Sequence, residues 1–266
     1  MRLQGAKAVV TGAASGLGEA VARRFHEEGA RVVLADIDLE GARRVAESID
    51  ASSRSAVAVG CDISRESSCN EMVQAAEVFF GGPITIFHAN AGTAFSGALL
   101  DAEAERIERA IGINLTGAIF SAKAALRSLS QAGEGSLLFT SSLQGVLGRP
   151  QRSVYTATKH AITGLVKSLA LEFGELGVRV NALAPVGIDT PLLRQQLSRT
   201  TDDVDGRIRD MAANLPLGRM PMPRDFTDAA LFLASSEARC ITGQTLVIDC
   251  GASAGIREPR PSKPAA

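Results

Sequence analysis

The amino-acid sequence predicts an α/β protein in which one doubly wound, parallel sheet of about seven strands is flanked by helices. Short apolar runs alternate with longer stretches of helical periodicity, a pattern typical of parallel strands joined by right-handed crossovers. The chain has 266 residues and 45% hydrophobic content, so it can bury one large core. We therefore expect a single domain.

Seven short runs rich in Val, Ile, Leu and Ala are expected to form the strands. They span residues 8–11, 32–35, 57–59, 84–89, 136–140, 178–184 and 246–248. Because these runs are apolar almost throughout rather than alternating, the strands should be buried on both faces of the sheet.

Helical periodicity fills the segments between these runs. Leu17, Val21 and Phe25 recur at four-residue steps, and the longer stretches 103–129 and 154–173 show a similar pattern. In doubly wound sheets, ligands bind beyond the carboxyl ends of the strands. The functional residues are therefore expected in the loops that follow the strands.

The domain is expected to cover residues 1–255, with a substrate lid near 190–220 and a flexible tail at 256–266. The segment 191–216 is long, polar and charged, which is typical both of mobile lids and of ordinary solvated helices. Both interpretations stay open. The tail has no apolar periodicity, which favours a flexible extension.

Composition and charge exclude several classes of function. The net charge is -1 and the charges are spread along the chain, so no nucleic-acid partner is expected. The four cysteines form no C-x-x-C pair and have no His at metal-ligand spacing, which predicts neither a metal site nor disulfides. No signal-peptide or membrane-spanning pattern is present. The prediction is a cytoplasmic protein that does not associate with membranes.

A glycine-rich segment follows the first predicted strand and opens a helix. Residues 11–18 read TGAASGLG, and glycines there allow a tight turn and close approach of the backbone to a pyrophosphate. Asp36 ends the second strand 20 residues after Gly16, where its carboxylate can accept hydrogen bonds from a ribose. Asp36 would repel a ribose phosphate, and positions 15 and 37 are not basic. The segment predicts a dinucleotide site that prefers NAD(H) to NADP(H).

One tyrosine occurs in the chain, Tyr155, and Lys159 follows it by about one helical turn on the same face. A phenol has a pKa near 10, and a nearby ammonium and an oxidised nicotinamide would both favour its phenolate. Ser142, at the end of the strand 136–140, can donate a hydrogen bond to a substrate oxygen, and its neighbour Ser141 is an alternative. His160 is interpreted as a packing or surface residue.

With these residues the chain resembles the classical short-chain dehydrogenase/reductase family, a group of Rossmann-fold proteins, from residue 3 to residue 251. Residues 11–18 match the family's T-G-x-x-x-G-x-G, Asp62 matches its adenine-contacting Asp, and residues 90–92 match its N-A-G. Asn114 fills its fourth catalytic position. Residues 181–190 are similar to its N-A-x-x-P-G-x-I-x-T, which meets the nicotinamide amide.

The resemblance implies a catalytic tetrad of Asn114, Ser142, Tyr155 and Lys159. In it Tyr155 is the general acid/base, Ser142 holds the substrate oxygen, Lys159 binds ribose and tunes the phenol, and Asn114 anchors a water of the proton relay. The residues expected to contact NAD(H) are Gly12, Ser15, Gly16, Leu17, Gly18, Asp36, Ile37, Asp62, Ile63, Asn90, Ala91, Gly92, Tyr155, Lys159, Pro185, Ile188 and Thr190. Those expected to contact the substrate are Ser142, Gln144, Tyr155 and Val186.

The expected reaction is hydride transfer between nicotinamide and a secondary alcohol or ketone. Candidate pocket residues are mixed in polarity, which suits a small and alicyclic substrate: Thr93, Leu143, Gln144, Arg149, Val186 and Leu192. The family also implies a homotetramer built through the stretches 103–129 and 154–173.

Three residues depart from the family pattern at positions where it has glycine. Val186 stands where the family has glycine, so either the turn is rearranged or a β-branched side chain enters the pocket. We hypothesise that Val186 narrows the pocket and favours compact substrates. Pro221 and Cys250 also replace family glycines, and both changes are expected to be neutral.

Two other functions remain open. A 3-oxoacyl carrier-protein reductase shares the tetrad, and Arg149 and Arg152 could serve its acidic carrier, but Asp36 speaks against it because such reductases usually take NADPH. A non-catalytic dinucleotide-sensing protein could use the same fold. Measurements of cofactor preference and of turnover would separate these readings.

Overall fold

The computed structural model describes residues 1–198 and 200–255, and the strands within them form one sheet with the order β3-β2-β1-β4-β5-β6-β7. All neighbouring strands pair in parallel. The seven strands are β1 (Lys7–Thr11), β2 (Arg31–Asp36), β3 (Ala56–Gly60), β4 (Ile86–Ala89), β5 (Gly135–Thr140), β6 (Val178–Pro185) and β7 (Thr245–Ile248). The predicted fold is confirmed, and the chain reverses its direction of winding between β1 and β4.

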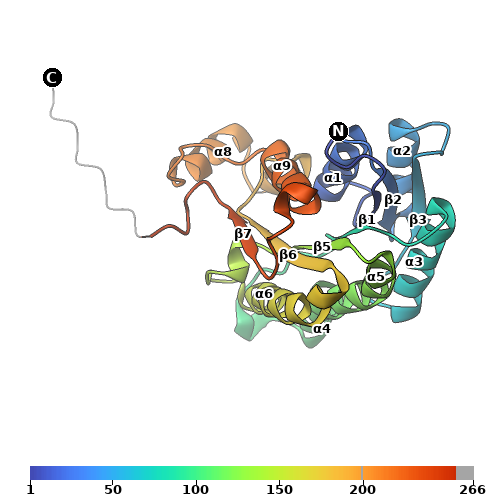
Figure 1. Ribbon diagram of the computed structural model, residues 1–266. Helices are drawn as coiled ribbons and strands as arrows, with labels where there is room; N and C mark the ends of the chain where they lie inside the picture. Colours follow the sequence, from blue (N-terminus) through green and yellow to red (C-terminus); the bar gives the residue numbers. More distant parts are fainter. Residues whose placement is uncertain (199, 256–266) are drawn as a thin grey trace, which may run out of the picture.

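Helices cover both faces of the sheet (Figure 1). One layer holds α1 (Gly16–Glu27), α2 (Leu39–Ile49) and α9 (Pro223–Ala234). The other holds α3 (Glu66–Phe80), α5 (Ala118–Ala132) and α6 (Ser153–Phe173), with α4 (Ala104–Ile111) packed against α6. In the described part of the chain, no helix is both long and apolar enough to cross a bilayer.

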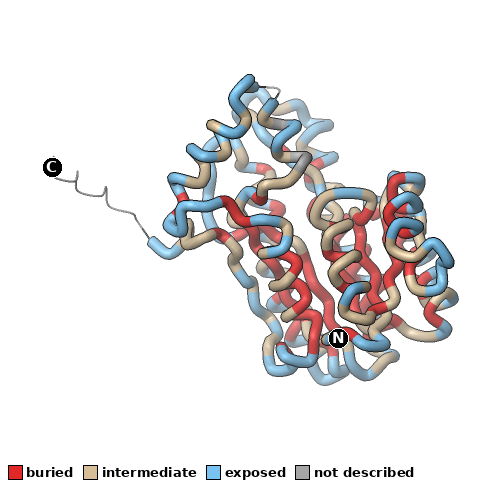
Figure 2. Tube along the Cα trace, turned by 90° about the horizontal axis from the view of Figure 1, so that it is seen from above, coloured by how far each residue is buried: buried red, intermediate tan, exposed pale blue. Residues whose placement is uncertain are grey.

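The core lies on both sides of the strands, which appear as the buried centre of Figure 2. Successive residues of a strand point to opposite faces, so Leu137 joins the cluster under α3, α5 and α6 while Leu138 joins the cluster under α1, α2 and α9. Both side chains are fully buried. Burial on both faces explains why the strand sequences lack polar alternation.

The stretch 103–129 is not the continuous α-helix that its periodicity suggests. After α4, residues Gly112–Gly117 form a π-helical turn, and α5 begins at Ala118. A π turn adds a residue to the helical repeat and often occurs at functional sites. Asn114 lies within this turn.

The region expected to be a lid contains two short helices, α7 (Pro191–Ser198) and α8 (Val204–Ala213). Arg194 joins them to the preceding loop, because its guanidinium bonds Asp189 at 2.7 Å and Asp205 at 2.8 Å. The predicted flexible tail, 256–266, lies outside the described residues.

Cys250 adopts a left-handed backbone conformation with φ 53°. Side chains other than glycine are strained there by about 1–3 kcal/mol, which is a local cost that the expectation of a neutral replacement did not include. Pro221 shows no such strain, and its carbonyl accepts a hydrogen bond from the amide of Asp189 at 3.0 Å.

Candidate active site

Six sequence-predicted parts of the site lie along the carboxyl edge of the sheet, where each ends or follows a different strand. The glycine-rich turn follows β1, Asp36 ends β2, Asp62 follows β3, Asn90 follows β4, Ser142 follows β5 and Pro185 ends β6. This convergence is a property of the parallel topology, because all the strands end at the same edge.

The glycine-rich turn packs directly against the loop after β4. Gly12 has φ 68°, and a Cβ placed on it would lie 2.9 Å from the Cα of Ala91. The side-chain amide of Asn90 donates to the Thr11 carbonyl at 3.0 Å, and the Thr11 hydroxyl accepts the Asn90 amide at 3.0 Å. Ser15 precedes α1, is exposed and makes no side-chain capping bond. The turn therefore offers free donors at the positive end of α1, as an anion requires.

The Asp36 carboxylate is hydrogen-bonded to the glycine-rich turn. One oxygen accepts the amide of Ala14 at 2.9 Å, and the other accepts the amide of Asp38 at 3.0 Å. No lysine or arginine of the described residues forms an ion pair with it. Its neighbour Ile37 is 75% exposed. A negative charge beside an exposed apolar side chain suits an adenosine ribose and adenine ring.

The other expected cofactor residues occupy different environments. Asp62 binds the amide and hydroxyl of Ser64, while Ile63 is buried against Gly117 of the π turn. Ile188 is buried in the core, and the Thr190 hydroxyl accepts the Leu193 amide at the start of α7.

Asn114 is held by two hydrogen bonds to the backbone of one residue. Its side-chain oxygen accepts the Thr93 amide at 2.7 Å, and its side-chain nitrogen donates to the Thr93 carbonyl at 2.8 Å. A Cβ on Gly92 would lie 3.1 Å from the Asn114 oxygen and 3.7 Å from the Lys159 ammonium nitrogen. The π turn thus places Asn114 beside Lys159, with a glycine leaving room between them.

Lys159 is 4% exposed, and its ammonium lies 5.6 Å from the centre of the Tyr155 ring. The ammonium donates to the Thr140 carbonyl at 2.8 Å, which is its only hydrogen bond within the described residues. Burial lowers the Lys159 pKa to about 8. The lysine is therefore still mainly charged at neutral pH.

Burial also raises the pKa of the Tyr155 phenol, while a hydrogen bond with Ser142 and the charge of Arg152 lower it in part. The sequence predicted that Lys159 would favour the phenolate. In the protein alone burial outweighs these stabilising groups, because a phenolate is costly away from water. Arg152, whose charge lowers the Tyr155 pKa, was not predicted from the sequence to act on this phenol.

The structure distinguishes Ser142 from Ser141. The Ser141 hydroxyl donates to the Lys159 carbonyl at 3.2 Å and is buried under α6. Ser142 instead interacts with the Tyr155 phenol and lines a cavity. Of the two serines, Ser142 is therefore the one nearer the Tyr155 phenol, and its role stays a prediction. His160 is exposed.

A buried polar chain joins Lys159 to the glycine-rich turn and was missed by the sequence reasoning. The Thr140 hydroxyl donates to the side-chain oxygen of Asn90 at 3.0 Å and lies 2.9 Å from His88 Nε2. His88 is fully buried, and burial lowers its pKa to about 3, so it is neutral. The sequence did contain a sign of this chain, because His88 and Thr140 are polar residues within otherwise apolar predicted strands.

A cavity of about 120 Å³ opens next to Ser142. It is lined by Ser142, Leu143, Gln144, Leu147, Gly148, Arg149, Pro185, Val186 and Gly187. Thr93 is not among these residues, and the Leu192 side chain lies outside the described part of the structure. Val186 has no left-handed strain, and its amide donates to the Ile248 carbonyl at 3.0 Å. Val186 is thus among the residues that line the cavity.

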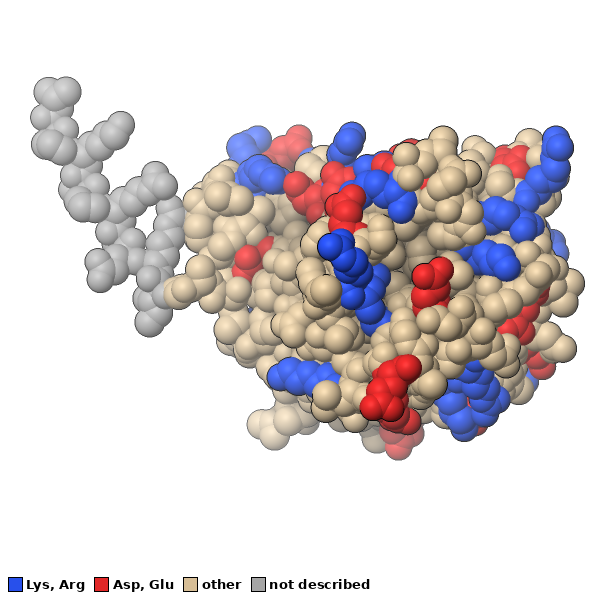
Figure 3. Space-filling view, in the orientation of Figure 1, with Lys and Arg blue, Asp and Glu red and all other residues tan. Residues whose placement is uncertain are grey.

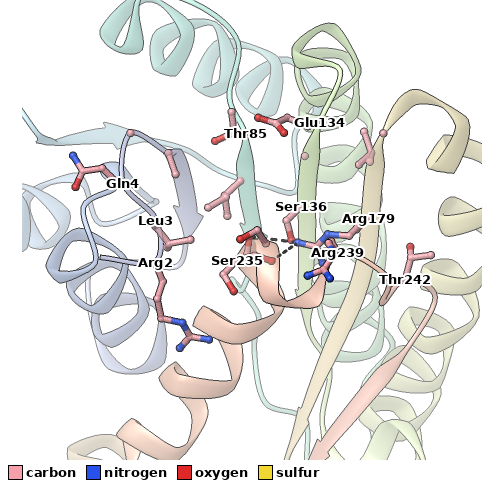
Figure 4. Close-up of a pocket in the computed structure, with 18 of the residues that line it drawn as sticks. Arg2, Leu3, Gln4, Thr85, Glu134, Ser136, Arg179, Ser235, Arg239 and Thr242 are labelled. Carbon is pink, nitrogen blue, oxygen red and sulfur yellow. Dashed lines mark hydrogen bonds between the residues drawn. The ribbon is translucent and has the colours of Figure 1, made fainter.

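A larger hollow of about 590 Å³ lies at the opposite, amino edge of the sheet (Figure 4). Its polar groups are largely used within the protein: Arg179 donates to the carbonyls of Ala234 and Ser235, and Arg2 pairs with Glu237. None of the residues assigned to chemistry lines it. On the face seen in Figure 3, positive and negative side chains are interspersed.

These residues fit a nicotinamide dinucleotide. The glycine-rich turn allows close backbone approach, and the Asp36 carboxylate lies beside it. An ammonium has three donors, and Lys159 uses one within the described residues, which leaves two for ribose hydroxyls.

Residues 12–253 match the family model described as enoyl-(acyl carrier protein) reductase. The chain is 38% identical over 255 residues to a 2,5-dichloro-2,5-cyclohexadiene-1,4-diol dehydrogenase of Sphingobium indicum, covering 96% of this chain and 99% of the relative. It is 38% identical over 248 residues to the cis-4-hydroxycyclohexanecarboxylate dehydrogenase of Sinomonas cyclohexanicum, covering 93% and 96%.

A solved structure is also similar: 3-ketoacyl-(acyl-carrier-protein) reductase from Brucella melitensis complexed with NADH. It shares 35% sequence identity with a TM-score of 0.84, covering 94% of this chain and 99% of that one. Together with the parallel sheet and the residues at its carboxyl edge, these similarities show that the chain is an oxidoreductase of the classical short-chain dehydrogenase/reductase family.

Proposed function

We propose that this protein is an NAD(H)-dependent oxidoreductase that interconverts a compact, alicyclic secondary alcohol and its ketone, with Tyr155 as general acid/base. The observation that carries the proposal is the position of the Tyr155 ring, 5.6 Å from the buried ammonium of Lys159, with Ser142 near its phenol at the same edge as the glycine-rich turn. Two of the relatives described above are named for cyclic alcohols, which supports this substrate class.

In the oxidation direction, Tyr155 accepts the proton of the substrate hydroxyl while Ser142 donates a hydrogen bond to the same oxygen. The nicotinamide, when bound, accepts the hydride that leaves the carbinol carbon. The charged Lys159 and Arg152 favour the phenolate that this step needs, against the cost of burial. Asn114 holds the loop after β4 in place through the Thr93 backbone.

The cofactor preference follows from Asp36. Its carboxylate lies in the glycine-rich turn with no cationic partner among the described residues, so a 2′-phosphate there would meet an uncompensated negative charge. The NADH in the similar Brucella structure supports the same preference.

The size of the pocket supports a compact substrate. Its volume of about 120 Å³ is close to that of cavities of ~150 Å³ that bind benzene. The side-chain oxygen of Gln144 is buried without a hydrogen-bond partner, which is costly unless a ligand donates to it. A substrate hydroxyl or ring substituent can supply that donor. Val186 lines the same space, which supports the hypothesis that it limits substrate size.

The test follows nicotinamide absorbance with NAD and with NADP over cyclic and acyclic secondary alcohols, for the native protein and for Val186→Gly. NAD-linked turnover of cyclic alcohols is expected, and Val186→Gly should extend it to bulkier ones. Turnover with NADP alone would show that Asp36 was misinterpreted. No turnover with either cofactor, in a protein that still binds NADH, would favour the dinucleotide-sensing alternative.

A 3-oxoacyl carrier-protein reductase is the second candidate, favoured by the similarity to the Brucella enzyme. Arg149 lines the cavity mouth, where an acidic carrier could bind. This candidate requires reduction of a carrier-bound 3-oxoacyl group at rates above those for free cyclic ketones. The same absorbance assay, run in the reductive direction, decides between the two candidates.

We also propose a homotetramer, located in the cytoplasm. Exposed apolar side chains on α4, α5 and α6 support an interface there: Ile111 and Ile119 are each 40% exposed and Leu171 is 86% exposed. The four cysteines are free thiols, which supports a reducing compartment. Sedimentation analysis would report the assembly.

Burial of Lys159 has a consequence for stability. At pH 7, Lys159→Met should stabilise the protein without cofactor by about 1–3 kcal/mol, because the variant avoids the cost of charging a buried amine. The folded pKa of about 8 lies below the ordinary lysine pKa of 10.5. Between those values the native fold has released the proton that the unfolded chain still holds, so native stability rises with pH and the advantage of the variant shrinks. Denaturant titrations at pH 7 and pH 9.5 would measure both effects; an advantage that does not change with pH would contradict them.

A further inference from the structure

The turn that leads into α6 carries two arginines, Arg149 and Arg152, on either side of a strained residue. Gln151 between them adopts a left-handed conformation with φ 59°. Its carbonyl accepts the Gly97 amide at 3.0 Å, which holds the turn against the loop after β4. Strained residues persist where the surrounding structure enforces them, often at ligand sites.

Neither arginine is neutralised by the protein. No carboxylate of the described residues lies within ion-pair distance of Arg149 or Arg152. The one hydrogen bond of the Arg152 guanidinium goes to the Phe95 carbonyl at 3.2 Å. Burial and the charge of Arg149 both lower the Arg152 pKa, so the two cations stand close enough to repel each other. An anion between them would relieve that repulsion.

The neighbourhood adds further positive potential. Arg152 is the residue before α6, a helix of 21 residues whose first turn contains no acidic side chain. The amino end of such a helix carries a partial positive charge. Arg149 is exposed at the rim of the cavity that Ser142 lines, and Arg152 is half-buried near Tyr155. The cations therefore flank the place where the substrate oxygen would bind.

We infer that Arg149 and Arg152 bind a carboxylate on the substrate, so that the protein acts on ring-sized hydroxy acids in preference to neutral alcohols. This inference rests on the proposed function, because it uses the Ser142–Tyr155 pair as the position of the reacting hydroxyl. A carboxylate accepts the paired donors of a guanidinium well, which fixes the ring at one end while Ser142 and Tyr155 hold the hydroxyl at the other.

The test compares binding of cyclohexanecarboxylate and cyclohexanecarboxamide, which have the same ring but differ in charge and cannot be oxidised. Isothermal titration calorimetry, with NADH present and absent, measures both affinities in the native protein, in Arg149→Gln and in Arg152→Gln. The carboxylate should bind roughly tenfold or more tightly than the carboxamide in the native protein. Either substitution should remove most of that difference, and should weaken carboxamide binding far less than carboxylate binding.

Arg239→Gln is the matched control. Arg239 is also exposed, but it lines the hollow at the opposite edge of the sheet (Figure 4). Its substitution removes one charge from the protein and should leave both affinities as they are. Melting curves check that each variant is folded, and Arg149→Gln remains informative if Arg152→Gln does not fold.

The turnover of 4-hydroxycyclohexanecarboxylate and of its methyl ester separates this inference from the proposed function. The acid should have a kcat/KM at least roughly tenfold above the ester, and the advantage should be lost in Arg149→Gln. The inference would be overturned if the acid and the ester were turned over equally, or if the two binding probes had equal affinities. The proposed function would still stand in either case. Selective carboxylate binding without any turnover would support the anion site but would contradict the proposed function, because hydroxy acids of this size would then not be substrates.

Discussion

Tyr155→Phe should lower kcat/KM for alcohol oxidation by about 10²–10⁴-fold, the range that a positioned general acid/base contributes. The substitution removes the hydroxyl that exchanges a proton with the substrate. It keeps the ring, which packs with Phe95 and Val154. We therefore expect a folded protein that binds NADH with nearly native affinity and transfers hydride slowly.

Steady-state kinetics and NADH fluorescence titration would measure the two effects separately. His160→Ala is the control, because His160 lies on the same helix but is exposed. It should retain native rates. Activity of Tyr155→Phe above about a tenth of native would mean that the proton is carried by another group, and the role of Tyr155 would have to be abandoned.

Asp36→Asn should shift the cofactor preference toward NADP by roughly 100-fold, measured as the ratio of kcat/KM for NAD to that for NADP. One unit charge at about 5–6 Å from a phosphate charge, at an effective dielectric constant near 20, contributes about 3 kcal/mol of repulsion. Asparagine has nearly the same shape and keeps an oxygen that can accept the Ala14 amide. The shift should therefore come from charge and should decrease at high salt.

Glu40→Gln is the matched control for this charge change. Glu40 is an exposed residue of α2, where it pairs with Arg43. Its substitution removes an equal charge near the same strand end and should leave the cofactor ratio within a few-fold of native. If both variants shift the ratio equally, the preference reflects the general field of the protein and not Asp36.

Most of the architecture could be predicted from the sequence because it depends on local patterns. Each predicted strand lies within two residues of its observed bounds; β4, for example, starts at Ile86 where residue 84 was expected. The strands of a parallel sheet are buried on both faces, so a short apolar run in the sequence is enough to predict each of them. The interruption of 103–129 at Gly112–Gly117 could not be seen, because a π turn changes the local periodicity by one residue and leaves the apolar face almost intact.

The electrostatics of the site depend on packing between distant segments, and the sequence was a poor guide to them. The Lys159 pKa is lowered by burial beneath residues far away in the chain, and the Tyr155 pKa is raised for the same reason. Spacing predicted that Tyr155 and Lys159 are neighbours but could not predict how strongly burial acts on either pKa. The same holds for Thr140, whose carbonyl and hydroxyl join Lys159 to Asn90 across two strands.

The most direct test of the proposed reaction is to follow the hydrogen itself. A cyclic secondary alcohol deuterated at its carbinol carbon is incubated with native protein and NAD, and the reduced nicotinamide is analysed by mass spectrometry. One deuterium per reduced nicotinamide, formed at a rate that collapses in Tyr155→Phe, is the predicted result. Ketone formed without deuterium in the nicotinamide, or labelled nicotinamide formed at the same rate by Tyr155→Phe, would contradict the account.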